Sequence, residues 1–194
     1  MKTYKKIEEH PRLSIYHDDC PESPREWSNL GYFITKDSNY LSPDQHEQLE
    51  EIVISTGDDA KDGEDHMEMI KKRVREEMTE KVLAIYPVTK YEHSGIAYSL
   101  GNSRGWDYSN NGFYIITDKS IKECGTEKKY WEDNIRAEIE TYNKYVNGEV
   151  YRFTLYDDKG EYEDSCCGFY DIEDIREHLP KEWKNEDLDE YLNN

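Results

Sequence analysis

The densest group of residues that could carry chemistry lies between His93 and Asp107. It combines a histidine, serines, an arginine, a tryptophan and an aspartate: His93, Ser94, Ser99, Ser103, Arg104, Trp106 and Asp107. These are the residue types of a nucleophile, a general base and an orienting acid. No Gly-x-Ser-x-Gly turn presents a serine here, and short polar side chains commonly hydrogen-bond loop backbone instead. A catalytic role and a loop-anchoring role therefore both stay open.

A second polar group precedes it in the chain: His17, Asp18, Asp19, Glu22, Arg25 and Glu26. A histidine and several carboxylates this close could hold a divalent cation, which prefers oxygen ligands. The spacing matches neither an EF-hand nor a His-Glu-x-x-His pattern, and Asp18 and Asp19 would point to opposite sides of a strand. We expect no metal or other cofactor, and an Arg25–Glu26 ion pair that fixes a long loop.

Four cysteines, Cys20, Cys124, Cys166 and Cys167, lack the spacing of a zinc site. A reactive thiolate needs positive neighbours, whereas Cys166 and Cys167 stand among acidic residues. We expect reduced thiols that pack at a strand end. The segment 101–105 has two glycines but no lysine, so it is not a phosphate-binding loop.

Negative charge gathers in two runs along the chain. The first contains Asp58, Asp59, Asp62, Glu64 and Asp65, and the second contains Asp157, Asp158, Glu161, Glu163 and Asp164. Such runs are often only a solvated surface. Rows of carboxylates can also imitate the phosphates of nucleic acid and occupy a basic groove, and Tyr156, Tyr162 and Tyr170 could add contact area.

The whole composition is acidic, because the chain has 44 Asp and Glu and only 25 Lys and Arg, which gives a formal charge of −19. This charge disfavours lipid surfaces and direct nucleic-acid binding, and it favours a partner with a basic surface. Met1–His10 lacks the apolar run of a signal peptide, and no stretch reaches the roughly twenty apolar residues of a membrane span. We therefore expect a cytoplasmic protein.

These residues must be positioned by strands and helices that the hydrophobic pattern predicts. Strands are expected at 13–16, 30–35, 82–88, 96–100, 112–117, 149–156 and 161–170, and helices at 44–54, 64–81, 126–146 and 172–178. We expect 96–100 and 112–117 to form a long hairpin, and 149–170 to form a second one around the turn at 157–160. The segment 56–65 is predicted to be a loop.

The order of these elements predicts an α+β fold: a mainly antiparallel sheet with three or more helices packed on one face. A chain of 194 residues supports one good core. We therefore predict a single acidic domain over 1–194, in which the acidic tail 181–194 is either a docked helix or frayed.

Several short motifs resemble a family of small, largely uncharacterised proteins of bacteriophages and other mobile elements. They are Cys20-Pro-Glu-Ser-Pro-Arg-Glu-Trp-Ser-Asn-Leu-Gly31, Tyr91-Glu-His-Ser-Gly95, Trp106-Asp107 with Gly112, Ala137-Glu138 with Tyr142 and Tyr145, and Asp164-Ser-Cys166 with Gly168-Phe-Tyr170. The resemblance covers about residues 14 to 175. It implies a phage or prophage accessory protein that acts against a host defence, as an anti-CRISPR protein does.

Three hypotheses follow from the sequence. The first is a non-enzymatic inhibitor that binds the basic groove of a host defence nuclease, such as Cas9, through its acidic runs. The second is an enzyme or small-ligand binder with a pocket built from Arg25, Glu26, His93, Ser94, Trp106 and Asp107. The third is a structural phage protein that associates with itself as a homo-oligomer.

Overall fold

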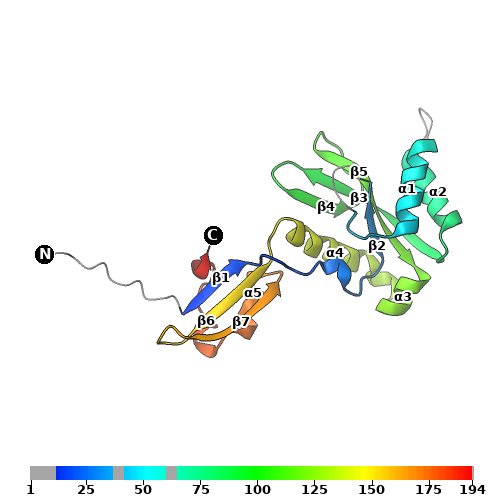
Figure 1. Ribbon diagram of the computed structural model, residues 1–194. Helices are drawn as coiled ribbons and strands as arrows, with labels where there is room; N and C mark the ends of the chain where they lie inside the picture. Colours follow the sequence, from blue (N-terminus) through cyan, green and yellow to red (C-terminus); the bar gives the residue numbers. More distant parts are fainter. Residues whose placement is uncertain (1–11, 37–41, 60–64, 194) are drawn as a thin grey trace. The chain divides into compact units, whose positions relative to one another are not determined.

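The computed structural model describes residues 12–36, 42–59 and 65–193. The backbone packs into two compact units (Figure 1). The central unit is Ser23–Asn143, and the terminal unit combines the chain up to Glu22 with the chain from Lys144 onward. The single domain expected from the sequence stays a prediction.

A four-stranded antiparallel sheet forms the middle of the central unit, in the order β2-β5-β3-β4. Its strands are β2 (Tyr32–Thr35), β3 (Val82–Glu92), β4 (Ile96–Leu100) and β5 (Tyr108–Thr117). The helical segments are η1 (Pro24–Glu26), α1 (Glu47–Asp59), α2 (His66–Glu77), α3 (Asp118–Cys124), η2 (Lys128–Tyr130) and α4 (Trp131–Val146), whose last turn belongs to the terminal unit.

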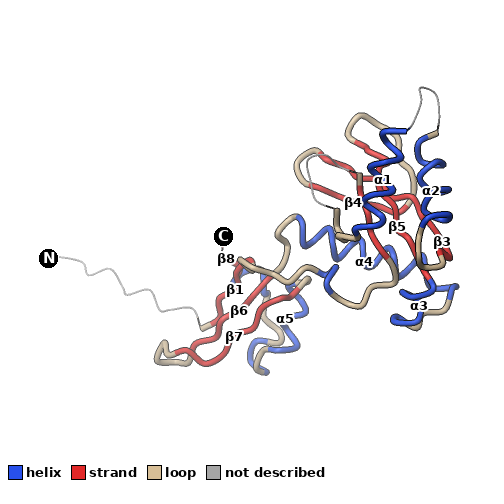
Figure 2. The backbone as a smooth tube through the Cα atoms, turned by 45° about the vertical axis from the view of Figure 1, so that its right-hand side comes forward, coloured by secondary structure: helices blue, strands red, loops and turns tan. Residues whose placement is uncertain are grey.

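Helices cover both faces of this sheet (Figures 1 and 2). Ile34 and Phe113 pack with apolar residues of α1 and α2. Their strand neighbours Phe33 and Tyr114 point to the opposite face, since side chains alternate along a strand, and there Phe33 contacts Tyr142 of α4. Trp131, Ile135, Ile139 and Tyr142 of α4 are all buried.

The pairing of the strands corrects one expectation. β4 does not pair with β5 in a hairpin; both pair with β3, on its two opposite edges. Every strand has two hydrogen-bonding edges, and β3 uses one for β5 and the other for β4. The short turn at 93–95 makes β3–β4 the local hairpin. The predicted loop at 56–65 also starts too early, since α1 continues to Asp59 and Thr56 is fully buried.

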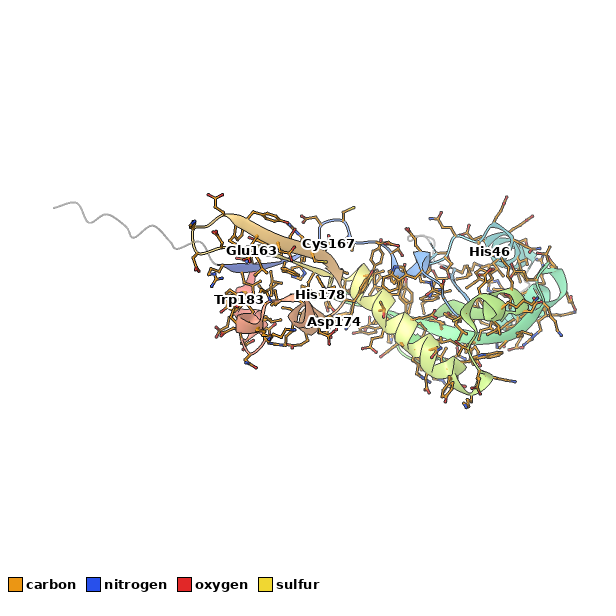
Figure 3. The ribbon with its side chains drawn as sticks, turned by 90° about the horizontal axis from the view of Figure 1, so that it is seen from below. His46, Glu163, Cys167, Asp174, His178 and Trp183 are labelled. Atoms are coloured by element: carbon orange, nitrogen blue, oxygen red, sulfur yellow. The ribbon has the colours of Figure 1, made fainter. Side chains whose placement is uncertain are left out.

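The terminal unit holds a second four-stranded sheet, in the order β7-β6-β1-β8. Its elements are β1 (Leu13–His17), β6 (Tyr151–Tyr156), β7 (Tyr162–Phe169), α5 (Ile172–His178), η3 (Lys181–Trp183), η4 (Leu188–Tyr191) and β8 (Leu192–Asn193). β8 runs parallel to β1, and the other pairs are antiparallel. Figure 3 labels His178 of α5 and Trp183 of η3, on the segment that packs against this sheet.

The α+β class and the antiparallel character of the sheets are thus confirmed, with two sheets instead of one. The tail is docked: Leu188 is buried in the core of the terminal unit, and Leu192 pairs with Ile15. No helix within the described ranges is long and apolar enough to cross a bilayer.

Candidate functional site

Arg25 is the centre of the most elaborate polar network in the central unit. Its side chain is only 3% exposed, and it uses all five of its N–H donors. Nε and Nη2 form a two-point contact with the carboxylate of Asp44, at 3.0 and 2.7 Å. Nη1 donates to Glu138 at 2.9 Å and to Asn29 at 3.1 Å, and Nη2 also donates to the carbonyl of Gly31 at 2.8 Å.

The partners of Arg25 are themselves held by backbone and by a buried tyrosine. The other oxygen of Glu138 accepts from the backbone N–H of Leu30 at 2.8 Å. The hydroxyl of Tyr114 donates to Glu138 and accepts from the N–H of Gly31 at 2.9 Å. β5, α4 and the loop 25–31 are therefore joined at one point, and the loop has little freedom to move.

Gly31 is required at this junction for steric reasons. A Cβ atom built on Gly31 would lie 2.3 Å from the carbonyl oxygen of Ile115 and 2.9 Å from the ring of Tyr114. Contacts below 3.0 Å to backbone cannot be relieved by turning a side chain. The close approach of the loop to β5 thus depends on the absence of a side chain.

The electrostatics of the network favour a charged arginine and a neutral tyrosine. Burial alone would lower the pKa of Arg25, but the hydrogen bond and charge of Asp44, with Tyr114 and Glu138, outweigh it and raise the pKa. Burial and the charge of Glu138 raise the pKa of Tyr114, against the opposing effect of Arg25. One cation and two carboxylates leave the network with a single net negative charge.

A hollow of about 380 Å³ opens above this network. Its lining comes from η1 and the loop after it, the first residue of β2, the segment just before α1, and α3: Arg25, Glu26, Trp27, Ser28, Asn29, Gly31, Tyr32, Asp44, Gln45, His46, Ser120 and Glu123. The rings of Tyr32 and His46 meet edge to face, with centroids 4.5 Å apart. Figure 3 labels His46, just before α1.

One wall of the hollow is fixed by Tyr32. Its hydroxyl donates to Glu80 at 3.0 Å, and Glu80 also accepts from Thr117 at 2.7 Å and pairs with Lys119 at 3.4 Å. Burial and the hydrogen bond and charge of Glu80 raise the pKa of Tyr32, and the charge of Glu123 adds to this while Lys119 opposes it. Tyr32 is therefore a neutral, oriented ring at neutral pH.

The structure separates the residues of the predicted alternative pocket into two groups. Arg25 and Glu26 line the hollow near the end of β5, where Gly31 meets Ile115. His93 and Ser94 lie in the turn between β3 and β4, and Trp106 and Asp107 precede the start of β5. The two segments of the second group are joined through the backbone, because the N–H of Glu92, next to His93, donates to the carbonyl of Asp107 at 3.1 Å.

The segment before β5 has an anchoring network of its own. The hydroxyl of Thr89 lies 2.7 Å from the carbonyl oxygen of Gly101 and 2.6 Å from Oδ1 of Asn110, and its single hydrogen serves these two acceptors. Asn110 also contacts both backbone groups of Ser103. Trp106 is fully exposed beyond it.

The polar group at 17–22 forms local contacts within the terminal unit. His17 contacts the carbonyl of Gly148, Asp18 accepts from the N–H groups of Cys20 and Gly168, and Asp19 pairs with Arg152. No set of three or more His, Cys, Asp or Glu in the described part of the chain is arranged to hold a metal. The cysteines are free, and Cys166 and Cys167 are exposed on β7 rather than packed.

The two acidic runs have different positions. In the first, Asp58 and Asp59 end α1, Asp62 and Glu64 lie outside the described residues, and Asp65 caps α2 by accepting from Met67 and Glu68 at 3.1 and 3.2 Å. The second run lies on the β6–β7 hairpin and the outer strand β7. Figure 3 labels Glu163 on this strand.

Sequence reasoning missed further residues of the hollow, which are Tyr32, Asp44, His46, Ser120 and Glu123. It also missed Tyr114 and Glu138, which belong to the buried network of Arg25. α3, which carries two of them, was also missed, although Thr117 and Ser120 form a capping box and Gly125 follows the helix in a left-handed conformation. That local signal could have located the helix.

The chain matches no protein-family model, no curated protein and no solved structure.

Proposed function

We propose that this protein is a non-enzymatic inhibitor from a phage or other mobile element, active in the cytoplasm of the bacterial host. It binds by an acidic surface to the basic, nucleic-acid-handling groove of a host defence nuclease, of which a CRISPR nuclease such as Cas9 is the leading example. The observation that carries the proposal is the exposed β6–β7 hairpin, which presents five acidic residues on one outer strand and its turn.

The carboxylates of the hairpin divide into structural and free ones. Asp157 accepts from the backbone of Lys159 and Glu161 and so stabilises the turn, and Asp158 pairs with Arg12 at 3.2 Å. Asp164 accepts from the N–H of Ser165. The side-chain carboxylates of Glu161 and Glu163 are exposed and form no hydrogen bond or ion pair within the part of the chain that the structure describes.

Free carboxylates on an exposed strand suit a basic partner for two reasons. They need not break an internal ion pair before they bind, and their charge speeds encounter with a surface of opposite sign. Tyr162, 64% exposed between them, adds an aromatic contact of the kind that is enriched in interfaces. The formal charge of −19 adds a negative electrostatic potential over the rest of the protein surface, which also attracts a basic partner.

The test is inhibition of DNA cleavage by Cas9 loaded with guide RNA, together with the binding kinetics of the two proteins. The double variant Glu161→Gln/Glu163→Gln should bind more slowly, by about threefold or more at low salt, because exposed charges act chiefly on association. The difference should shrink as salt rises. A pull-down from host lysate, read by mass spectrometry, identifies the target if Cas9 is not bound.

The matched control is Asp133→Asn/Glu140→Gln, which removes the same charge from the exposed side of α4. If both double variants lose the same binding, only net charge matters and the hairpin is not the interface. Inhibition that both double variants retain in full, at every salt concentration, would refute binding by phosphate mimicry.

A further inference from the structure

We propose that the hollow beside Arg25 is a receptor for the guanidinium group of an arginine side chain presented by a partner protein. This inference goes beyond the acidic hairpin, because every described residue that lines the hollow belongs to the central unit. It therefore stands or falls separately from the inhibitor proposed above.

The floor of the hollow cannot serve an anion. Arg25 is a cation at the floor of the hollow, but all five of its N–H donors are already used. They bind Asp44, Glu138, Asn29 and the carbonyl of Gly31. A phosphate or carboxylate would have to displace one of these partners from a buried arginine, which is costly. The network instead offers a single net negative charge.

The rim of the hollow adds two further negative charges. Glu26 and Glu123 are exposed and lie on different elements, η1 and α3. Neither carboxylate forms a hydrogen bond or ion pair inside the ranges that the structure describes. The two lysines of α3 form ion pairs outside the rim, Lys119 with Glu80 at 3.4 Å and Lys122 with Asp118 at 3.3 Å. Lys119 also interacts with the charge of Glu123, so it offsets part of the negative charge on this side without forming an ion pair with Glu123.

The walls are aromatic. Trp27 is 47% exposed, and Tyr32 and His46 form the edge-to-face pair described above. A ring face attracts a cation by its quadrupole, and a planar guanidinium can stack on it while it donates to carboxylates at its edge. Tyr32 is already oriented by Glu80, so this wall loses little freedom on binding.

The size fits one side chain with its flanking peptide. A volume of about 380 Å³ is at the small end of known ligand sites, which hold about 300–1,000 Å³. Arginine suits the site better than lysine, because stacking and forked donation both need a planar cation.

The experiment titrates the full-length protein with N-acetyl-L-arginine amide and follows the indole N–H resonance of Trp27 by NMR, assigned with Trp27→Phe. The arginine probe should shift this resonance saturably. The citrulline analogue, which has the same shape without the charge, should not, and the lysine analogue should bind more weakly. Inorganic phosphate should leave the resonance unchanged.

The variant Glu26→Gln/Glu123→Gln should weaken arginine binding by about three- to tenfold, since exposed carboxylates contribute modestly. Asp133→Asn/Glu140→Gln is the matched control and should bind as the parent does. Both pairs are exposed, and a thermal melt verifies their folding. The hairpin variant Glu161→Gln/Glu163→Gln should also keep full arginine binding, which separates this site from the inhibitor surface.

Three results would overturn the proposal. The first is no saturable shift with the arginine probe. The second is an equal shift with the citrulline analogue or with phosphate, which would show that the guanidinium charge is not recognised. The third is equal weakening in the rim variant and in the α4 control, which would show a general charge effect.

Discussion

Arg25 carries a full positive charge where water hardly reaches it. Removing a charge from water costs several kcal/mol, and this cost is offset only if every donor finds a partner. Here two carboxylates, an amide and a carbonyl supply them. The arginine that sequence reasoning took for a pocket residue, paired with Glu26, thus pairs instead with Asp44 and Glu138 and organises the fold around it.

Replacing Arg25 tests this role. Arg25→Ala should lower the free energy of unfolding by about 3–5 kcal/mol, because it leaves two partly buried carboxylates facing each other without a cation. Urea unfolding followed by circular dichroism measures the change. Arg136→Ala, on the exposed side of α4, is the control and should change stability by less than about 0.5 kcal/mol. A loss below about 1 kcal/mol for Arg25→Ala would contradict the role given to the network.

Gly31 offers a second test at the scale of one residue. Gly31→Ala places a methyl group against the backbone of Ile115, so it should destabilise the protein by about 1–3 kcal/mol. Ser28→Ala, three residues earlier and exposed, should be nearly neutral. The same urea assay applies, and equal stabilities of the two variants would show that the loop can move away from β5.

Within the helices and strands, the acidic residues have several different roles. Asp65 caps α2, Asp157 shapes a turn, and Asp164 and Asp18 accept from N–H groups of β7 at Ser165 and Gly168. β7 is an outer strand of its sheet, and charged side chains at such an edge discourage unwanted strand pairing. Several of these carboxylates therefore stabilise the fold itself. The carboxylates of Glu161 and Glu163 have no such structural role, so substituting them tests binding to a partner without disturbing the fold.

Two substitutions at Asp65 distinguish its role as a helix cap from the effect of its charge. Asp65→Ala should destabilise the protein by about 1 kcal/mol, whereas Asp65→Asn, which keeps an accepting oxygen, should cost at most a few tenths of a kcal/mol. Thermal melts of both variants measure the effect, with hydrogen exchange at the first turn of α2 as a local readout. Equal losses would mean that the charge of Asp65 matters rather than the cap, in line with the helix dipole.

At the scale of the whole molecule, each unit holds a tyrosine that resists ionisation. Burial, with the neighbouring Tyr145, Glu22 and Asp18, raises the pKa of Tyr170 to about 12 in the terminal unit. Its hydroxyl donates to the carbonyl of Glu22 at 2.6 Å. In the central unit, burial and Glu138 likewise raise the pKa of Tyr114.

Both units should therefore lose stability at alkaline pH. A raised pKa in the folded state means that the unfolded chain ionises first, at about pH 10, so the contribution is complete below that pH and is lost as pH rises towards the folded value. Urea midpoints measured from about pH 8 to about pH 11 should fall. Tyr170→Phe should flatten part of this fall, and Tyr162→Phe, at an exposed position, should not. A flat profile in the parent protein would contradict the prediction.

The sequence by itself determined the elements whose signals are local. The helix 172–178 and the strand 96–100 were predicted with the observed ends. Periodicity, caps and turn residues act over a few positions, so they can be recognised without knowing what the element packs against. The acidic hairpin belongs to this class, because its turn and its charges are contiguous in the chain.

The tertiary structure alone decided which strands pair and which residues surround Arg25. β5 lies against β3 rather than β4. Asp44 and Glu138 stand 19 and 113 positions from the arginine that they neutralise. A buried charge must be hydrogen-bonded in the folded protein, and its partners can come from any part of the chain. The spacing of residues along the sequence therefore does not identify them. The hollow, with its acidic rim and aromatic walls, exists only because those distant segments meet.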